Sequence, residues 1–247
     1  MDRFDEGLIR SQTRRLSVGL ARDAAEVREA QRLRWQVFAG ELGAKLQSAE
    51  PGIDQDIFDP YCEHLVVRDG GRVVGTYRLL PPKGAKRIGL YYSETEFDLI
   101  RLRGIRHRMV EVGRSCIAPG YRTGGVISLL WSGLARYVLS NGHGYLAGCA
   151  SISLADGGQT AAALLQREEH LAPAEYRVTP RRKVLLKKES PGGKVQLPPL
   201  VKGYLRAGAW ICGEPALDTE FNCADFFVLL PLERIESRYA RHFFGPG

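Results

Sequence analysis

Residues 111–131 read EVGRSCIAPGYRTGGVISLLW, a run in which a β-strand, a glycine turn and a helix follow one another directly. The first part is apolar enough for a buried strand, except for Glu111 and Arg114. The turn at 122–126 carries an arginine and two glycines. Glycines let a backbone approach an anion closely, and the N–H groups of a helix N-terminus attract negative charge. The stretch therefore predicts a strand–turn–helix unit suited to holding an anion.

The rest of the chain predicts a mixed sheet around this unit. Residues 63–82 form two β-rich runs about Gly70–Gly71, which is a strong hairpin signal. The strand at 109–119, the helix at 124–142 and the strand at 145–153 must form a parallel crossover. Further strands are expected at 16–23, 176–188, 209–217 and 225–232, and helices at 24–44, 96–102, 160–170, 199–207 and 233–244. The fold class is α/β or α+β, with a mainly antiparallel sheet and helices on both faces.

Composition predicts a single cytoplasmic domain over residues 1–247. The chain is 44% hydrophobic, which is enough for a substantial core. Its five cysteines are odd in number and form no C-x-x-C pair, so neither a disulfide framework nor a zinc knuckle is indicated. The N-terminus lacks the apolar core of a signal peptide, and no run approaches the ~18 apolar residues of a membrane span.

Glu111 and Arg114 are the first candidate catalytic residues. Alternate residues of a regular strand share a face, so two residues three apart point in opposite directions. A β-bulge at Gly113 would bring both side chains into one cleft and leave a backbone N–H to donate to a reacting carbonyl. The alternative is an edge strand whose charges face water.

Further side chains in apolar surroundings suggest a substrate pocket. They are Arg34 and Phe38 in the first helix, Asp56 and Asp59 in the loop after it, and Arg78 in the third strand. Together with the pair above, the set holds three arginines and three acids, more than a core tolerates unpaired. Either a cleft for a zwitterion or a carboxylate, or a structural ion-pair network, would use such a set.

Other classes of site are disfavoured. GRSCI lacks the second glycine of a nucleophile elbow, and the histidines lack metal-ligand spacing, so no metal is predicted. The formal charge of +7 includes a basic run at 180–188 and Arg101, Arg103, Arg106 and Arg108. This charge suits an acidic protein partner or an anionic membrane surface, or is simply a solvated face. A basic binding module without catalysis is the weaker alternative, and no nucleic acid is expected, because no aromatic residue interrupts the run at 181–188.

Several motifs occur in the order found in acyl-homoserine-lactone synthases, a branch of the GNAT acyltransferase superfamily. They are R-x-x-x-F (Arg34, Phe38), D-x-x-D (Asp56, Asp59), G-T-Y-R-L-L (Arg78) and E-x-x-R (Glu111, Arg114). Over most residues from about 30 to 244, the chain resembles the ornithine Nα-acyltransferases more closely. Matching stretches include FDPYCEHLVVRD, VVGTYRLLPP, YYSETEFDL, EVGRSCIAPGYRTGGVISLLWSGLARYV and GCAS. Lactone synthases usually carry a Trp where this chain has Gly43–Ala44.

The resemblance implies a GNAT fold and transfer of a long, 3-hydroxylated acyl chain to the α-amine of an amino acid. The donor would be acyl carrier protein, whose own phosphopantetheine carries the chain, so no tightly bound cofactor is expected. Ornithine is the family's usual acceptor. Glycine, glutamine, lysine or serine, or lactone synthesis, remain as alternatives.

The resemblance also implies roles for residues. Glu111 would be the general base, directly or through a water, and Arg114 would order the cleft around it. Arg34, Phe38, Asp56, Asp59 and Arg78 match the substrate pocket, and Arg122, Thr123, Gly124, Gly125 and Val126 would take the phosphopantetheine phosphate. Tyr204 is either a proton donor to the leaving thiolate or a buried structural tyrosine. The last helix, with Ile235, Tyr239 and Phe243, suits peripheral contact with the inner face of the cytoplasmic membrane.

Overall fold

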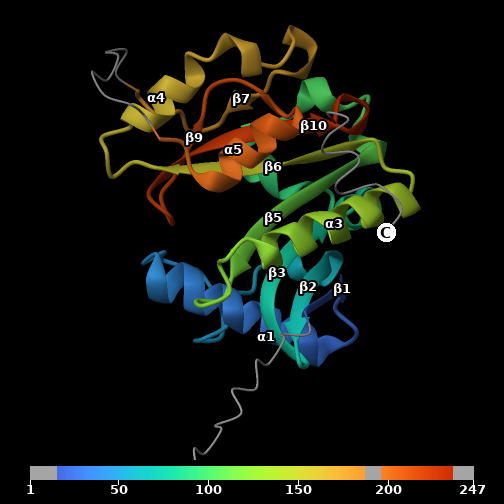
Figure 1. The fold of residues 1–247 in the computed structure, drawn as a ribbon. Helices are drawn as coiled ribbons and strands as arrows, with labels where there is room; N and C mark the ends of the chain where they lie inside the picture. The colour runs from blue at the N-terminus through green and yellow to red at the C-terminus, as the bar shows by residue number, and fades with distance from the viewer. Residues whose placement is uncertain (1–15, 187–195, 236–247) are drawn as a thin grey trace, which may run out of the picture.

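A computed structural model describes residues 16–186 and 196–235, and it is built on one twisted sheet (Figure 1). Within these residues the strand order is β1-β2-β3-β5-β6-β10-β8, with β9 beside β10. The strands are β1 (Leu16–Leu20), β2 (Glu63–Asp69), β3 (Arg72–Leu80), β5 (Met109–Ile117), β6 (Tyr145–Ser153), β8 (Trp210–Ile211), β9 (Ala216–Asp218) and β10 (Cys223–Pro231). Only β5 and β6 pair in parallel in this described sheet. The predicted mixed, mainly antiparallel sheet is confirmed.

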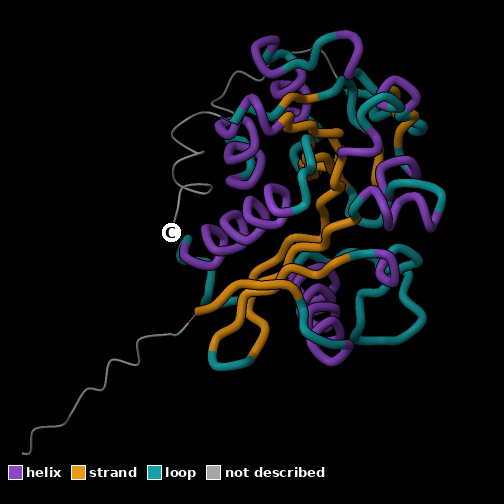
Figure 2. The backbone as a smooth tube through the Cα atoms, turned by 90° about the vertical axis from the view of Figure 1, so that its right-hand side faces the viewer, coloured by secondary structure: helices purple, strands orange, loops and turns teal. Residues whose placement is uncertain are grey.

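Helices cover both faces of the sheet (Figure 2). They are α1 (Ala24–Trp35), α2 (Pro82–Ile88), α3 (Gly125–Ser140), α4 (Gln159–Leu165) and α5 (Pro199–Ala207). In β2, Leu65 contacts α3 at Gly133, whereas its neighbour His64 lies beside Asp59 and the buried charges next to α1. Because consecutive residues of a strand point to opposite faces, α1 and α3 lie on opposite sides of the sheet.

Several elements differ from the predictions. The helix expected over 24–44 changes at Gln36–Glu41 into a π-helical turn, a form that is frequent at functional sites. The helix expected at 96–102 is instead β4 (Phe97–Asp98) followed by a 3₁₀ turn, because β4 pairs with β7 (Thr179–Pro180). Of the strand expected at 176–188, the described residues up to 186 form β7 and an isolated bridge from Lys183 to Ala216, and Pro180 has no N–H to donate to a longer ladder.

One helix was not predicted, and most of another predicted helix lies outside the described residues. Helix α2 was not predicted, although Pro82 opens it and Gly89 ends it in the left-handed region with φ 95°. Of the helix expected at 233–244, Leu232–Arg234 form a 3₁₀ turn, and positions 236–244, including Tyr239 and Phe243, lie outside the described residues.

The crossover strands β5 and β6 stay together for only a short distance. Their parallel pairing joins Met109–Glu111 to Tyr145–Ala147. Close contact continues to Gly148, where an added Cβ would lie 2.2 Å from the Val112 carbonyl oxygen. Beyond that point β5 keeps its partner β3 and β6 keeps its partner β10, but no pairing joins β5 to β6 in the described residues. The sheet therefore opens into a wedge.

A β-bulge shapes the open half of β5. Arg78 of β3 pairs with Gly113 and Thr76 pairs with Cys116, so β5 carries one extra residue between these pairs. Arg114 takes up the difference with φ 51°, an uncommon angle for a residue with a side chain. The bulge expected at Gly113 thus lies one residue later. It turns Arg114 to the same face as Glu111.

The contact that ends the β5–β6 pairing predicts a stability effect. Gly148→Ala should lower the free energy of unfolding by about 1–3 kcal/mol, because the new methyl group must push the Val112 carbonyl away. Gly113→Ala is the matched control, since no atom lies within 4 Å of an added Cβ there. Denaturant unfolding of both variants tests this, and equal stabilities would contradict it.

Candidate active site

One face of the sheet carries polar side chains across four strands. Residues paired across neighbouring strands point to the same face. By this register Arg78 of β3, Glu111 of β5, Ser151 of β6 and Asp225 of β10 all lie on the face that α1 covers. These four side chains line a single cavity of about 310 Å³ at the wedge, together with Arg114. Because β5 and β6 part at the wedge, side chains from all four strands can line one cavity.

A cluster of arginines and aspartates borders this cavity. Arg34 is fully buried, with Nε 2.8 Å from Asp54 Oδ2 and Nη2 2.8 Å from Asp59 Oδ1. Arg78 Nη1 lies 2.7 Å from Asp56 Oδ2 and 2.9 Å from Asp59 Oδ2. Burial opposes the charge on Asp59, but the two arginines hold the pKa of this carboxyl well below its usual range. Most of this set therefore forms a structural ion-pair network.

Arg114 is the exception among the three arginines. Its nearest carboxylate atoms, Asp54 Oδ2 and Asp56 Oδ2, are 3.6 and 3.8 Å away, beyond hydrogen-bond distance. Its guanidinium lies between the rings of Tyr92 and Phe221, at 5.7 and 5.3 Å from their centroids. Nε is shielded from solvent and has no hydrogen-bond partner. Arg114 is thus positioned by aromatic contacts and keeps donors for an anionic group in the cavity.

Glu111 is held rigidly by the segment before β5. Oε1 accepts hydrogen bonds from the backbone N–H and the hydroxyl of Ser93, and Oε2 accepts one from the Tyr92 N–H at 2.6 Å. A carboxylate has about four acceptor positions, so one remains on Oε2. Burial raises the pKa of Glu111, and these hydrogen bonds oppose the rise. The side chain is a fixed acceptor at the open end of β5.

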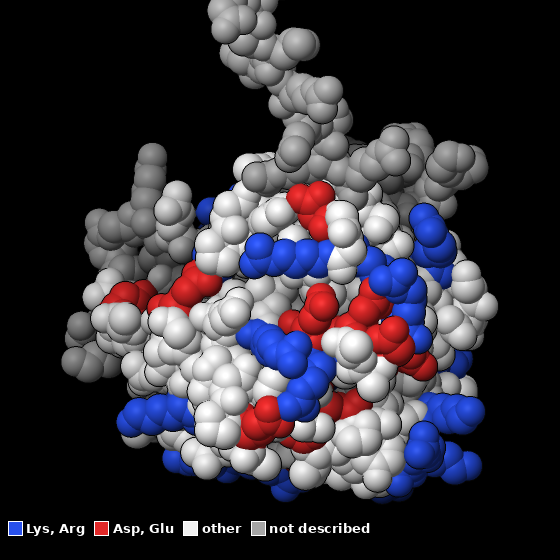
Figure 3. Space-filling model, turned by 90° about the horizontal axis from the view of Figure 1, so that it is seen from below, with Lys and Arg blue, Asp and Glu red and all other residues white. Residues whose placement is uncertain are grey.

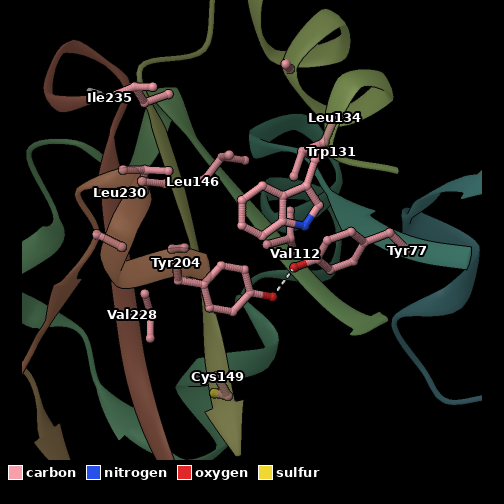
Figure 4. A pocket seen from close by; sticks show the side chains of 15 residues that line it. Tyr77, Val112, Trp131, Leu134, Leu146, Cys149, Tyr204, Val228, Leu230 and Ile235 are labelled. Carbon is pink, nitrogen blue, oxygen red and sulfur yellow. Dashed lines mark hydrogen bonds between the residues drawn. The ribbon is translucent and has the colours of Figure 1, made fainter. Parts of the chain in front are cut away.

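A second, apolar pocket lies on the other face of the wedge (Figure 4). Tyr77, Val112, Cys149 and Tyr204 line both spaces, so the two meet at these residues. The hydroxyls of Tyr77 and Tyr204 are hydrogen bonded, and the Trp131 ring stacks on Tyr204 with centroids 5.9 Å apart. Burial raises the pKa of Tyr204 well above its usual value, so its phenol keeps its proton. The two tyrosines mark the boundary between a polar and an apolar space.

The glycine turn stands at the start of α3. Gly124, with φ 95°, precedes the first helical residue, and no side-chain cap hydrogen bond covers the N–H groups of the first turn. Val126 is buried against Gly75, while Thr123 is exposed. Arg122 lies 2.8 Å from Glu41 through Nη1, so its charge is partly compensated. The backbone offers an anion site, and Arg122 would have to exchange partners to join it.

The structure brings most of the predicted residues together and adds three. Phe38, Arg78, Glu111, Arg114 and Tyr204 line the cavity, while Arg34, Asp56 and Asp59 support it from behind. Sequence reasoning missed Asp54, Ser93 and Asp225 as parts of the site. Asp225 had the signal that exposed Glu111, an acid within a buried strand. Asp54 and Ser93 lie in irregular segments, where no periodicity shows which way a side chain points.

The buried network predicts a stability difference between two arginines. Arg34→Met should lower the free energy of unfolding by about 3–5 kcal/mol, because Asp54 and Asp59 would lose their buried partner. Arg28→Met is the control, since Arg28 pairs with Glu50 at the surface and should cost less than about 1 kcal/mol. Chemical denaturation measures both. Equal losses would show that the buried cluster carries no special stability.

Comparisons with known proteins place the chain among acyltransferases. A model of the acetyltransferase (GNAT) domain matches residues 33–132. The L-ornithine Nα-acyltransferase of Brucella abortus is 37% identical over 248 residues, covering 92% of this chain and 88% of the relative. That of Rhodobacter capsulatus is 37% identical over 254 residues, covering 93% of this chain and 96% of the relative.

Solved structures support the fold. The AHL synthase LasI superposes with a TM-score of 0.55 at 16% identity, covering 94% of this chain and 96% of that one. FeeM, an N-acyl amino acid synthase from uncultured soil microbes, gives 0.52 at 12% identity, covering 90% and 93%. At these identities the likeness shows the GNAT-like fold alone. The sequence relatives show more: this chain is an acyltransferase that belongs to the L-ornithine Nα-acyltransferase family, as its motifs predicted.

Proposed function

We propose that the chain transfers a long, 3-hydroxylated fatty acyl group from acyl carrier protein to the α-amine of ornithine, giving lyso-ornithine lipid. The observation that carries this proposal is the position of Glu111, a fixed carboxylate at a wedge with a charged cavity on one face and an apolar pocket on the other. The relatives named as L-ornithine Nα-acyltransferases supply the acceptor.

Glu111 acts as the general base. The free acceptor position on Oε2 takes a proton from the α-amine, directly or through a water. The neutral amine nitrogen then attacks the thioester carbonyl, forming the C–N bond. As the tetrahedral intermediate collapses, the C–S bond breaks, and the second proton that the nitrogen loses goes to the leaving sulfur, which departs as a thiol. The backbone of β5 polarises the carbonyl oxygen. Tyr204, which keeps its proton, donates a hydrogen bond to the departing sulfur.

Arg114 binds the acceptor's α-carboxylate. Its guanidinium is the one of the three in the described cluster that no aspartate holds within hydrogen-bond distance. A guanidinium edge fits a carboxylate with two parallel hydrogen bonds. Arg34, Arg78, Asp56 and Asp59 shape the pocket around it, and Phe38 closes one side.

The donor reaches the wedge from the α3 face. The apolar pocket beside Tyr77 and Tyr204 takes the apolar part of the donor, and the residues 122–126 at the α3 N-terminus take its phosphate (Figure 4). The phosphopantetheine arrives on the carrier and leaves with it, so the protein needs no resident cofactor.

A basic surface docks the acyl carrier protein. Pairing of β4 with β7 joins the two basic runs of the sequence, and Arg101 and Arg181 bond across the join to backbone oxygens of Ala174 and Glu94. Arg103 and Arg182 are exposed there. By contrast, acidic and basic side chains alternate on the face in Figure 3. The same basic surface would hold the protein against an anionic membrane that receives the lipid product. Among the described residues, no helix has the length and apolarity to span a membrane.

Removing the base should abolish transfer without unfolding the protein. Glu111→Gln is expected to lower kcat about 10²- to 10⁴-fold, because the amide cannot accept the amine's proton. Ser93→Ala is the control, since it deletes one hydrogen bond to Oε1 and keeps the carboxylate. Acylation of ornithine is followed by mass spectrometry, and unfolding curves establish that both variants fold. Full turnover by Glu111→Gln would remove this residue from the mechanism.

Charge removal on the docking surface should affect only the donor. The double variant Arg103→Gln, Arg182→Gln is expected to raise KM for acyl carrier protein several-fold at low salt, with KM for ornithine unchanged. The exposed Arg32 of α1 gives the control Arg32→Gln. Steady-state kinetics at low and high ionic strength distinguish the outcomes. A donor KM that ignores both the variant and the salt would place the carrier elsewhere.

A further inference from the structure

We infer that Asp225 and Glu96 bind the side-chain ammonium of the acceptor and thereby select ornithine over amino acids without a side-chain cation. This inference rests on the proposed acylation of ornithine. It assigns a role to a second group of charges, in which Asp225 lines the same cavity and Glu96 lies beside Asp225.

Asp225 presents its carboxyl to the cavity from β10. The residue is 3% exposed, lines the cavity, and accepts a hydrogen bond on Oδ1 from the Cys223 thiol at 3.0 Å. A carboxylate oxygen of Glu96 lies within 4.8 Å of a carboxylate oxygen of Asp225. Glu96 Oε2 is shielded from solvent and has no hydrogen-bond partner among the described residues. Acceptor capacity is therefore buried here without a donor to fill it.

These two acids differ from every aspartate of the arginine cluster. Asp54, Asp56 and Asp59 each have an arginine within 3 Å, whereas no Lys or Arg of the described residues forms an ion pair with Asp225 or Glu96. Their neighbours are neutral or acidic. Tyr92 donates to Glu96, Ser151 and Cys223 donate to Asp225, and the Asp218 carboxyl is close to both.

Two buried acids in contact cannot both be ionised at low cost. Burial, with the charge of Asp225, raises the pKa of Glu96 to about 9, and burial raises that of Asp225. A proton thus stabilises the pair while the cavity is empty. An alkylammonium group at Asp225 does the same, with a full positive charge and three N–H donors. A neutral side chain offers neither.

Tyr92 links the arginine to the acid pair. Its ring centroid is 5.7 Å from the Arg114 guanidinium, and its hydroxyl bonds to Glu96. Arg114, Glu111 and Asp225 line the same cavity, so an acceptor with its α-carboxylate at Arg114 and its side-chain ammonium at Asp225 keeps its α-amine in the space that Glu111 borders. Glycine, serine and glutamine leave the acid pair without a cation.

The test compares ornithine with 2-aminopentanoate, which has the same carbon chain and no side-chain amine. The wild-type enzyme should prefer ornithine in kcat/KM by about 100-fold or more. In Asp225→Asn that preference should fall below about tenfold, mainly through a higher KM for ornithine. Glu96→Gln should reduce it in the same direction. Neither variant should lose the fold, because each replaces a buried acid that already favours its neutral form.

Glu63→Gln is the matched control. Glu63 is an exposed acid at the start of β2 and lines neither the cavity nor the apolar pocket. It should retain the wild-type preference. Undiminished preference in both Asp225→Asn and Glu96→Gln would overturn the inference while leaving ornithine acylation intact. If the wild type acylates neither amino acid, the proposed function fails. Binding of ornithine and of 2-aminopentanoate is then compared by calorimetry, and equal affinity for the two ligands would overturn the inference as well.

A bound metal is the competing explanation for this group of acids. Cys149 Sγ lies within 4.8 Å of the ligand atoms of both, as a metal site would require. Burial, however, raises the pKa of the Cys149 thiol well above its usual value, which disfavours the thiolate that a metal needs. Metal analysis of the purified protein, and assays with and without EDTA, decide the matter. Loss of ornithine preference on chelation would replace the ammonium site with a metal site.

Discussion

The parting of β5 and β6 is the constraint on which the rest of the structure depends. Three paired residues hold each strand in register, the backbones stay close as far as Gly148 and Val112, and no pairing joins the two strands beyond that point in the described residues. A complete ladder would have filled this space with backbone hydrogen bonds. Because it is incomplete, a charged cavity on one face and an apolar pocket on the other meet inside the sheet. A lipid donor and a zwitterionic acceptor can therefore approach each other from opposite sides of one layer.

The three arginines of the cluster differ in how tightly neighbouring groups hold their guanidinium groups. Arg34 and Arg78 are tied to aspartates from the loop after α1, which fixes that loop to the sheet. Arg114, on the bulge, rests against aromatic rings and keeps its donors. The sequence was compatible with either a structural ion-pair network or a binding cleft. The structure contains both an ion-pair network and a cavity beside it. The network supplies rigidity, and the cavity is lined by Arg114, whose guanidinium no carboxylate of the cluster holds within hydrogen-bond distance.

The sequence predicted the features that repeat along regular elements. Periodicity and turn residues located the hairpin, the crossover and α3, and a charge inside an apolar strand singled out Glu111. It did not predict the site of the bulge, because a backbone with φ 51° at Arg114 depends on the neighbouring strand rather than on the local residue. Nor did it show that Ser93 holds Glu111, since that contact joins an irregular turn to a strand. The roles of the predicted site residues, among them Glu111, Arg114, Tyr204 and residues 122–126, stay predictions.

The hydrogen bonds from Tyr92 and Ser93 to Glu111 make one turn responsible for two tasks. The turn that orients Glu111, the proposed base, also carries Tyr92 and leads directly into Glu96. Reshaping this turn to accept a different head group would therefore disturb proton transfer at the same time. Strand β10 does not combine these two tasks, because Asp225 reaches the cavity from a part of the chain separate from the turn that holds Glu111. Diversification of head groups within this architecture is accordingly easiest along β10, where selectivity can drift while the chemical step is preserved.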